Sequence, residues 1–377
     1  MMRSGSKRVR LVLVAGLAAP LLAACGSGSG GTTDAAKTTV SSAADAEVQL
    51  DSSAAAGETR RASPGCMGAP TRTAGLSRAS ITGADGTDHP YRLFEPDVAA
   101  DEPTPLVLDL HGLTEPIDFH AESSATETVA GGDGATVVTP QGTPNPFRWN
   151  PIPGADNPDV ILLRTLIEEI TSSHCIDLDR VYSQGISNGG IMSGILSCEL
   201  DDVIAAVGLV SGIQRGCVDT SPIPVVVFWG ELDTVLPYSG GVGAALLGGE
   251  PNVPTTVSVR PGGRWSPDGD YSGFPPVEVA VSQIARDNGC DAEPTTTMAS
   301  EHVEHHVWRN CDEGADVEFY VVTNGGHTWP GSKKFIDMNG GDDAATAAIT
   351  GVTTDEIDAT SVMWEFFKAH PMQTANS

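Results

Sequence analysis

The chain has few basic residues for its length: 21 lysines and arginines stand against 49 aspartates and glutamates, and the formal net charge is −28. A surface this acidic repels the phosphates of nucleic acids and of anionic lipid headgroups. The sequence therefore predicts no nucleic-acid partner, and a membrane attachment would need a covalent anchor. An acidic surface also fits a proteome that is acidic as a whole, so the charge alone assigns no function.

Other patterns are missing as well. No pair of cysteines has the CxxC spacing of a zinc site, and no segment of about 20–50 residues repeats. These absences argue against a structural metal, a solenoid or a propeller. The apolar run at 11–24 is shorter than the ~20 residues that a transmembrane helix needs. We therefore expect no bound metal and one globular domain.

The N-terminus has the order of a secretory signal, with basic residues, an apolar run and then small residues. The run ends in Leu-Ala-Ala-Cys25, which resembles the bacterial lipobox and implies cleavage before Cys25 and a lipid on its sulfur. The alternative is an ordinary signal peptide cut nearby. Residues 25–62 are rich in Gly, Ser, Ala and Thr and cannot bury enough surface to fold. We expect a signal at 1–24, a tether at 25–62 and a folded domain at 63–377.

The cysteine count also suggests export. Seven cysteines less Cys25 leave six, and an even number in an exported chain suggests disulfides. Six cysteines allow 15 pairings, among which sequence alone does not choose. Proximity along the chain suggests the bonds Cys198–Cys217 and Cys290–Cys311, which leaves Cys66–Cys175 as the third.

Short apolar runs alternate with helical patterns through the expected domain. The runs are rich in Val, Leu and Ile without alternation, which predicts strands buried on both faces of a parallel sheet. They lie at 105–110, 135–139, 180–183, 205–210, 224–229 and 317–322. Helical patterns lie at 157–170, 190–200, 276–288 and 358–369. This alternation predicts a mostly parallel, doubly wound α/β sheet with helices on both faces.

A glycine-rich turn, Gly185-Ile-Ser187-Asn188-Gly189, follows the expected strand at 180–183. A sharp strand-to-helix turn lifts a serine hydroxyl out of the sheet edge, and the flanking glycines let the backbone pass close to itself. The helix that begins at Asn188 points free N–H groups toward developing negative charge. We therefore predict that Ser187 is a nucleophile; the alternative is an ordinary Gly/Ser turn.

A nucleophilic serine needs a base, and the chain order in such sheets is serine, acid, histidine. His327 lies in the loop after the strand at 317–322, where open α/β sheets carry their chemistry. Asp233 follows the strand at 224–229 and is the predicted acid, with Glu231 as the fallback. The acid would hold the imidazole tautomer and stabilise the imidazolium that forms.

Two backbone N–H groups are predicted to form the oxyanion hole, those of Asn188 and of Leu113 in the loop after the strand at 105–110. His111 in that loop is expected to shape it rather than to act as a second base. The remaining histidines after Ser187 are expected to be unreactive. The histidines at 302, 305 and 306 are expected on a solvated face, with metal binding as the alternative. His370 is expected in a C-terminal tail.

Together these residues resemble the poly(3-hydroxybutyrate) depolymerase-like and feruloyl esterase-like α/β-hydrolases. The similar segments are 63–66, 108–112, 180–190, 230–238, 326–331 and 357–367, and the most specific are the SNGG elbow and the GHTWPG loop. Ile186 departs from the family, in which Met is usual, and no added substrate-binding domain is recognisable. The resemblance implies an α/β-hydrolase fold and carboxylic ester hydrolysis by Ser187, Asp233 and His327 without metal or organic cofactor.

The combined expectation is an extracytoplasmic serine esterase, secreted or lipid-anchored, that is monomeric and meets the membrane only through its lipid. Small esters, oligoesters and envelope-linked esters suit a tethered enzyme better than solid polyester. Trp149 and Trp329 either line the substrate pocket or are buried packing aromatics. Residues 239–275, rich in Gly and Pro, form either an excursion beside the site or a surface insertion.

Two other functions compete with this expectation. One is an acyltransferase of the same fold that acts on cell-envelope sugars. The other is a non-catalytic ligand-binding lipoprotein, which would not require the complete set of serine, acid and histidine.

Overall fold

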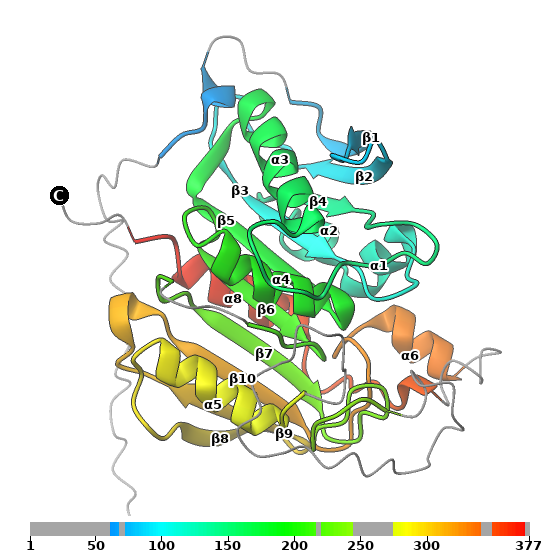
Figure 1. The fold of residues 1–377 in the computed structure, drawn as a ribbon, viewed down its shortest axis with the longest axis vertical. Coiled ribbons are helices and arrows are strands. Elements are labelled where there is room, and N and C mark those ends of the chain that lie inside the picture. Colours follow the sequence, from blue (N-terminus) through cyan, green and yellow to red (C-terminus); the bar gives the residue numbers. More distant parts are fainter. Residues whose placement is uncertain (1–60, 68–71, 216–219, 244–273, 341–348, 374–377) are drawn as a thin grey trace, which may run out of the picture. The chain divides into compact units, whose positions relative to one another are not determined.

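The computed structural model describes residues 61–67, 72–215, 220–243, 274–340 and 349–373 (Figure 1). The expected signal at 1–24, Cys25 and nearly all of the tether lie outside these residues, as does most of 239–275. The last two residues of the expected tether are part of the fold instead. Leu178 N donates to Arg61 O at 2.8 Å, and Ala62 forms a bridge with Asp177. The folded region therefore begins slightly earlier than residue 63.

The described strands form one ten-stranded sheet in the order β1-β2-β4-β3-β5-β6-β7-β10-β9-β8 (Figure 1). The central strands from β4 to β10 run parallel, and antiparallel strands extend the sheet on both sides. The strands are β1 (Gly75–Thr82), β2 (Asp88–Glu95), β3 (Thr104–Leu110), β4 (Thr136–Pro140), β5 (Ile176–Ile186), β6 (Ala206–Val210), β7 (Val225–Gly230), β8 (Thr295–Ser300), β9 (Val303–Trp308) and β10 (Val317–Val322). The predicted mostly parallel sheet is confirmed.

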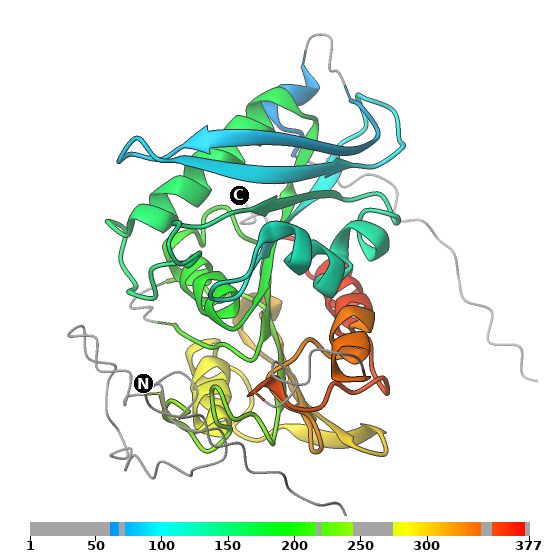
Figure 2. The ribbon, with the colours of Figure 1, turned by 90° about the vertical axis from the view of Figure 1, so that its right-hand side faces the viewer.

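Helices cover both faces of the sheet, as Figure 2 shows. One face carries α3 (Pro158–Ser173), α4 (Asn188–Glu199) and α5 (Val277–Asp287), and the other carries α1 (Ile117–Ser124), α2 (Thr126–Val129), α6 (Lys333–Gly340) and α8 (Ala359–Ala369). Successive residues of β3 point to opposite faces, so Leu106 and Leu108 pack in the core beneath α3 and α4, whereas Val107 packs in the core beneath α8. The sheet thus separates two hydrophobic cores.

The ends of two predicted helices show why the sequence folds this way locally. The Asn157 side chain accepts a hydrogen bond from Asp159 N at 2.9 Å, and Pro158 occupies the first turn of α3, where its missing N–H costs nothing. The Asp358 side chain accepts from Ser361 N at 2.8 Å at the start of α8. Each cap satisfies a backbone donor that the helix itself cannot pair.

Two disulfide bonds cross-link segments of the described fold. The predicted bonds Cys66–Cys175 and Cys290–Cys311 are confirmed, and they close loops with sequence separations of 109 and 21. Cys198 in α4 is also disulfide-bonded, whereas its expected partner Cys217 lies outside the described residues. Among the described residues, none of the helices has the length and apolar character needed to cross a membrane.

Candidate active site

The turn after β5 holds Ser187 in an unusual backbone conformation. Its φ is 55° and its ψ is −118°, a region that non-glycine residues rarely adopt and that is found at functional sites. Ser187 N donates to Val210 O at 2.8 Å, and α4 begins at the next residue. A Cβ on Gly189 would lie 2.0 Å from Leu110 O, so only glycine lets the turn pack this closely against the end of β3. The geometry is that of a nucleophile elbow.

A buried acid orients His327. The His327 ring donates from Nδ1 to Asp233 Oδ2 at 2.7 Å, and both residues are buried. The other carboxylate oxygen of Asp233 accepts from Val235 N and Leu236 N, each at 2.8 Å. Three donors therefore fix the carboxylate of Asp233. Because His327 binds Asp233 through Nδ1, its second ring nitrogen, Nε2, is the one that can act on a substrate or nucleophile.

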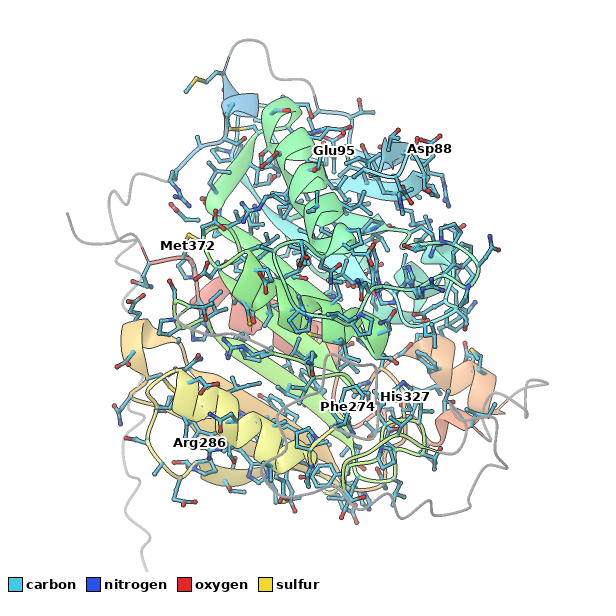
Figure 3. All side chains as sticks on the ribbon, viewed as in Figure 1. Asp88, Glu95, Phe274, Arg286, His327 and Met372 are labelled. Carbon is cyan, nitrogen blue, oxygen red and sulfur yellow. A yellow bond between two sulfur atoms is a disulfide. The ribbon has the colours of Figure 1, made fainter. Side chains whose placement is uncertain are left out.

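The loops after β7 and β10 are joined along their backbones. Leu232 N donates to Gly325 O at 2.9 Å, and a Cβ on Gly230 would lie 2.4 Å from the same oxygen. Figure 3 places His327 at the edge of the sheet where the central strands end. Ser187, after β5, belongs to the same edge. No hydrogen bond joins the Ser187 hydroxyl to His327 among the residues described, and such bonds often tighten only with substrate bound.

The two N–H groups expected to form the oxyanion hole are both without an acceptor in the described part of the chain. Asn188 is the first residue of α4, and the N–H groups of a helix's first turn have no carbonyl partner within the helix. Leu113 lies between two fixed residues: Gly112 N donates to Glu115 Oε2 at 2.6 Å, and Thr114 N donates to Phe147 O at 2.7 Å. The loop is therefore held on both sides of an unpaired donor.

A buried ionic network lies behind this loop, and sequence reasoning missed it. His120 Nε2 lies 3.1 Å from Asp109 Oδ1, and His120 Nδ1 lies 3.3 Å from Glu115 Oε2. Asp109 also accepts from Ser124 Oγ at 2.6 Å and from Gln184 Nε2 at 3.0 Å. Burial alone would lower the pKa of His120, but the two carboxylates outweigh it and raise the pKa to about 10. A protonated His120 thus forms an ion pair with Glu115, and Glu115 in turn accepts the hydrogen bond from Gly112 N.

His111 shapes the same loop from within. Its ring is fully buried, and burial lowers its pKa to about 4. Nδ1 donates to Gly112 O at 2.7 Å, and Nε2 accepts from Gly142 N at 2.9 Å. Both ring nitrogens are occupied by the backbone, so the ring links two loops and is not placed to exchange protons with a substrate.

The two tryptophans considered for the substrate pocket are packing residues instead. Trp149 is 0% exposed and Trp329 is 1% exposed, so neither offers a surface to a ligand. The Trp149 indole donates to His111 O at 3.0 Å, and the Trp329 ring meets His120 edge-on at 5.9 Å between centroids. Trp149 still matters for the elbow, because its backbone N donates to the Asn188 side chain at 2.6 Å and its O accepts from that side chain at 3.0 Å.

The histidine cluster expected on a solvated face lies in or beside β9. All three of its side chains, at 302, 305 and 306, are half-buried. His305 stacks on Tyr320 with 4.1 Å between ring centroids and lies 3.0 Å from Glu318. His302 is half-buried and pairs with Glu356, and His370 bonds to Phe366 O at 2.7 Å. Within the described ranges, no group of three or more His, Cys, Asp or Glu side chains is arranged to hold a metal ion.

The chain is similar in sequence to known esterases. A family model described as "Esterase PHB depolymerase" matches residues 89–229. "Feruloyl esterase B" of Piromyces equi is 30% identical over 62% of this chain, and the match spans only 41% of that longer protein. "Probable feruloyl esterase C" of Aspergillus oryzae is 30% identical over 62% of this chain and 84% of its own length. The second relative is therefore covered over most of its chain.

A solved structure supports the fold alone. The acetyl xylan esterase of Aspergillus awamori superposes with a TM-score of 0.50 at 16% identity, over 70% of this chain and 98% of that chain. The predicted α/β-hydrolase fold is confirmed by this similarity together with the parallel sheet and its two helical layers.

Proposed function

Because the chain belongs to the esterase family named for PHB depolymerase, we propose that it hydrolyses carboxylic esters through a relay of Ser187, His327 and Asp233. The observation that carries the proposal is the buried Asp233–His327 hydrogen bond of 2.7 Å at the same sheet edge as the strained Ser187 elbow. A strained serine is costly to maintain without a function.

The proposed reaction has two halves. His327 Nε2 takes the proton of the Ser187 hydroxyl while its oxygen attacks the ester carbonyl, and the N–H groups of Leu113 and Asn188 stabilise the oxyanion. His327 then gives the proton to the leaving alcohol, and an acyl-enzyme remains. Water attacks the acyl-enzyme in the same way and releases the acid with a free Ser187. Asp233 stabilises the imidazolium in both halves.

The names of the relatives suggest the kinds of ester to test. They include feruloyl esterases, a poly(3-hydroxyalkanoate) depolymerase and an acetylxylan esterase. We propose small acyl esters, hydroxyalkanoate oligomers and acylated sugars as candidate substrates. None of these chemistries requires a metal or an organic cofactor.

The first test replaces the nucleophile. Ser187→Ala should lower kcat for p-nitrophenyl butyrate about 10⁴-fold or more, because the attacking oxygen is lost. Ser172→Ala is the matched control, since Ser172 is an exposed serine at the end of α3 and the whole of β5 separates it from the elbow. Turnover by Ser187→Ala at the rate of the control would remove Ser187 from the proposed role.

Export and anchoring form a second part of the proposal. The two described disulfides require an oxidising compartment, and the N-terminal sequence through Cys25 suggests lipidation. In a bacterial host that processes lipoproteins, the wild type should fractionate with membranes, whereas Cys25→Ser should be released in soluble form. Equal distribution of the two proteins would contradict the anchor.

A further inference from the structure

Glu115 binds both polar backbone groups of Gly112, the residue before the predicted oxyanion donor Leu113. Gly112 N donates to Glu115 Oε2 at 2.6 Å, and Glu115 N donates to Gly112 O at 3.2 Å. The second contact closes a β-turn over residues 112–115. A glutamate side chain can reach the N–H three residues before it, as it does in a helix capping box. One residue therefore fixes Gly112 through its N–H and its carbonyl.

The direction of the Leu113 N–H follows from these contacts. That N–H belongs to the same peptide unit as Gly112 O, and in a planar trans peptide the two groups point in opposite directions. Gly112 O is held by two donors, Glu115 N and, at 2.7 Å, His111 Nδ1. The carbonyl is thus turned into the loop, and the Leu113 N–H is turned out of it. Leu113 is 40% exposed, which is consistent with an N–H that is open to a substrate.

The turn is strained and needs such contacts. Thr114 has a φ of 67°, in the left-handed region, where a β-branched residue is rarely found. A strained conformation of this kind persists only where neighbouring groups over-determine it. Here Thr114 N donates to Phe147 O at 2.7 Å, and Glu115 binds the start of the turn. Loss of the Glu115 side-chain contact would let the turn relax and the Leu113 N–H change direction.

The Glu115 carboxylate is itself held in place from behind. His120 Nδ1 lies 3.3 Å from Glu115 Oε2, and the other ring nitrogen lies 3.1 Å from Asp109 Oδ1. Burial would raise the pKa of Glu115, but His120 and the Gly112 N–H outweigh burial and lower the pKa, so the carboxylate is ionised at neutral pH. Its other oxygen, Oε1, is buried and has no hydrogen-bond partner in the described part of the chain. The contacts of Oε2 therefore fix this side chain.

We propose that Glu115 is a positioning residue for the proposed ester hydrolysis, acting through Gly112 to aim the Leu113 N–H at the oxyanion. The inference rests on the proposed function, because the oxyanion forms only when Ser187 attacks an ester. A well-aimed donor matters most when negative charge develops on the carbonyl oxygen. Misdirection of the donor therefore lowers kcat with little change in KM, whereas loss of a residue that only stabilises the fold would leave both values of the folded enzyme unchanged.

Two conservative variants separate the reach of the side chain from its charge. Glu115→Asp keeps the charge that pairs with His120 but draws the acceptor back by one methylene group, whereas Glu115→Gln keeps an oxygen at the same reach and removes the charge. We expect Glu115→Asp to lower kcat for p-nitrophenyl butyrate about 30-fold, part of the ~10²–10³-fold that loss of a whole oxyanion donor costs, with KM within about threefold. Glu115→Gln should stay within about fivefold of the wild type. The same two changes at Glu122, an exposed acid of α1, are the matched controls and should leave kcat unchanged.

Inhibition by an alkyl trifluoromethyl ketone tests the stabilisation of the oxyanion directly. Ser187 Oγ bonds to the ketone carbon, its proton passes to His327, and the carbonyl oxygen becomes the anion that the two N–H groups would bind. The inhibition constant should rise about 30-fold in Glu115→Asp, in parallel with the fall in kcat. In Glu115→Gln and in the Glu122 controls it should stay near the wild-type value.

The outcomes distinguish this inference from the esterase proposal, with circular dichroism to check the folding of each variant. A wild-type kcat in Glu115→Asp, a loss in Glu115→Gln as large as that in Glu115→Asp, or a fall in kcat without weaker inhibition would overturn the positioning role. Should Glu115→Asp fail to fold, Glu115→Gln decides: values near the wild type support the inference, and a loss of more than about tenfold in kcat overturns it. A wild type that hydrolyses no ester would instead overturn the proposed function.

Discussion

The carboxylate of Asp233 serves two purposes with its two oxygens. One oxygen accepts a hydrogen bond from His327 Nδ1, and the other accepts hydrogen bonds from two backbone N–H groups of its own loop. An amide in its place could still accept the backbone bonds, but it could not stabilise an imidazolium, and its NH₂ group favours the wrong imidazole tautomer. The residue is thus a better candidate for the acid than Glu231, which is exposed.

The variant Asp233→Asn should therefore lower kcat for p-nitrophenyl butyrate by about 10⁴-fold while the protein stays folded. Glu231→Gln is the matched control and should stay within about twofold of the wild type. Steady-state kinetics and circular dichroism measure both effects. If Glu231→Gln were the more damaging change, the acid would have to be reassigned.

His120 couples the stability of the fold to pH. Its pKa is about 10 in the folded chain, where it faces Asp109, Glu115 and the neutral His111, and about 6.5 when unfolded. The folded state holds the proton more tightly, so this contribution to stability is complete below pH ~6.5 and is lost as the pH rises toward 10. The loss can reach about 1.4 kcal/mol per pH unit.

Urea unfolding at pH 6, 8 and 9.5 tests this coupling. The free energy of unfolding of the wild type should fall across that range, and His120→Gln, if folded, should be less stable at pH 6 and show a shallower fall. His370→Gln serves as the control and should follow the wild type. A wild-type stability that stays constant or rises from pH 6 to 9.5 would show that His120 is not a buried cation.

Sequence patterns singled out the three proposed catalytic residues but not the buried network beside them. Ser187, Asp233 and His327 follow strands, in motifs that glycines make recognisable. Asp109 had a signal that went unused, because it is an acid within a strand that is otherwise apolar, and a buried carboxylate needs partners. The partners of Asp109 are His120 and Ser124 in α1 and Gln184 in β5, and no spacing rule connects them to Asp109.

At the scale of elements, burial explains which strands could be predicted. Every residue of β3, β4, β6 and β7 is buried, so their apolar runs stand out in the sequence. By contrast, β1 and β8 are exposed along most of their length and have no apolar run to mark them. Edge strands depend on pairing with a neighbour rather than on burial, and a sequence pattern does not record that pairing.

The two described disulfides should stabilise the fold unequally. In the chain-entropy model, a bond that closes a separation of 109 residues contributes about 5 kcal/mol, and one that closes 21 contributes about 3 kcal/mol. The double variant Cys66→Ser/Cys175→Ser should therefore unfold at lower urea concentration than Cys290→Ser/Cys311→Ser. The reverse order in equilibrium unfolding would show that local strain or residual structure outweighs loop closure.

At the scale of the whole molecule, the sheet brings together residues that are distant in sequence. The elbow after β5, the acid after β7 and the histidine after β10 meet at one edge because these strands are parallel. The parallel sheet and this edge followed from the alternation of strands and helices.

The most direct test of the account is to locate the residue that a fluorophosphonate modifies. Peptide mass spectrometry of the treated, folded chain should find one adduct, on Ser187, and His327→Ala should lose most of it because the serine is no longer activated. An unmodified wild type, or an adduct on a different serine, would contradict the proposed relay.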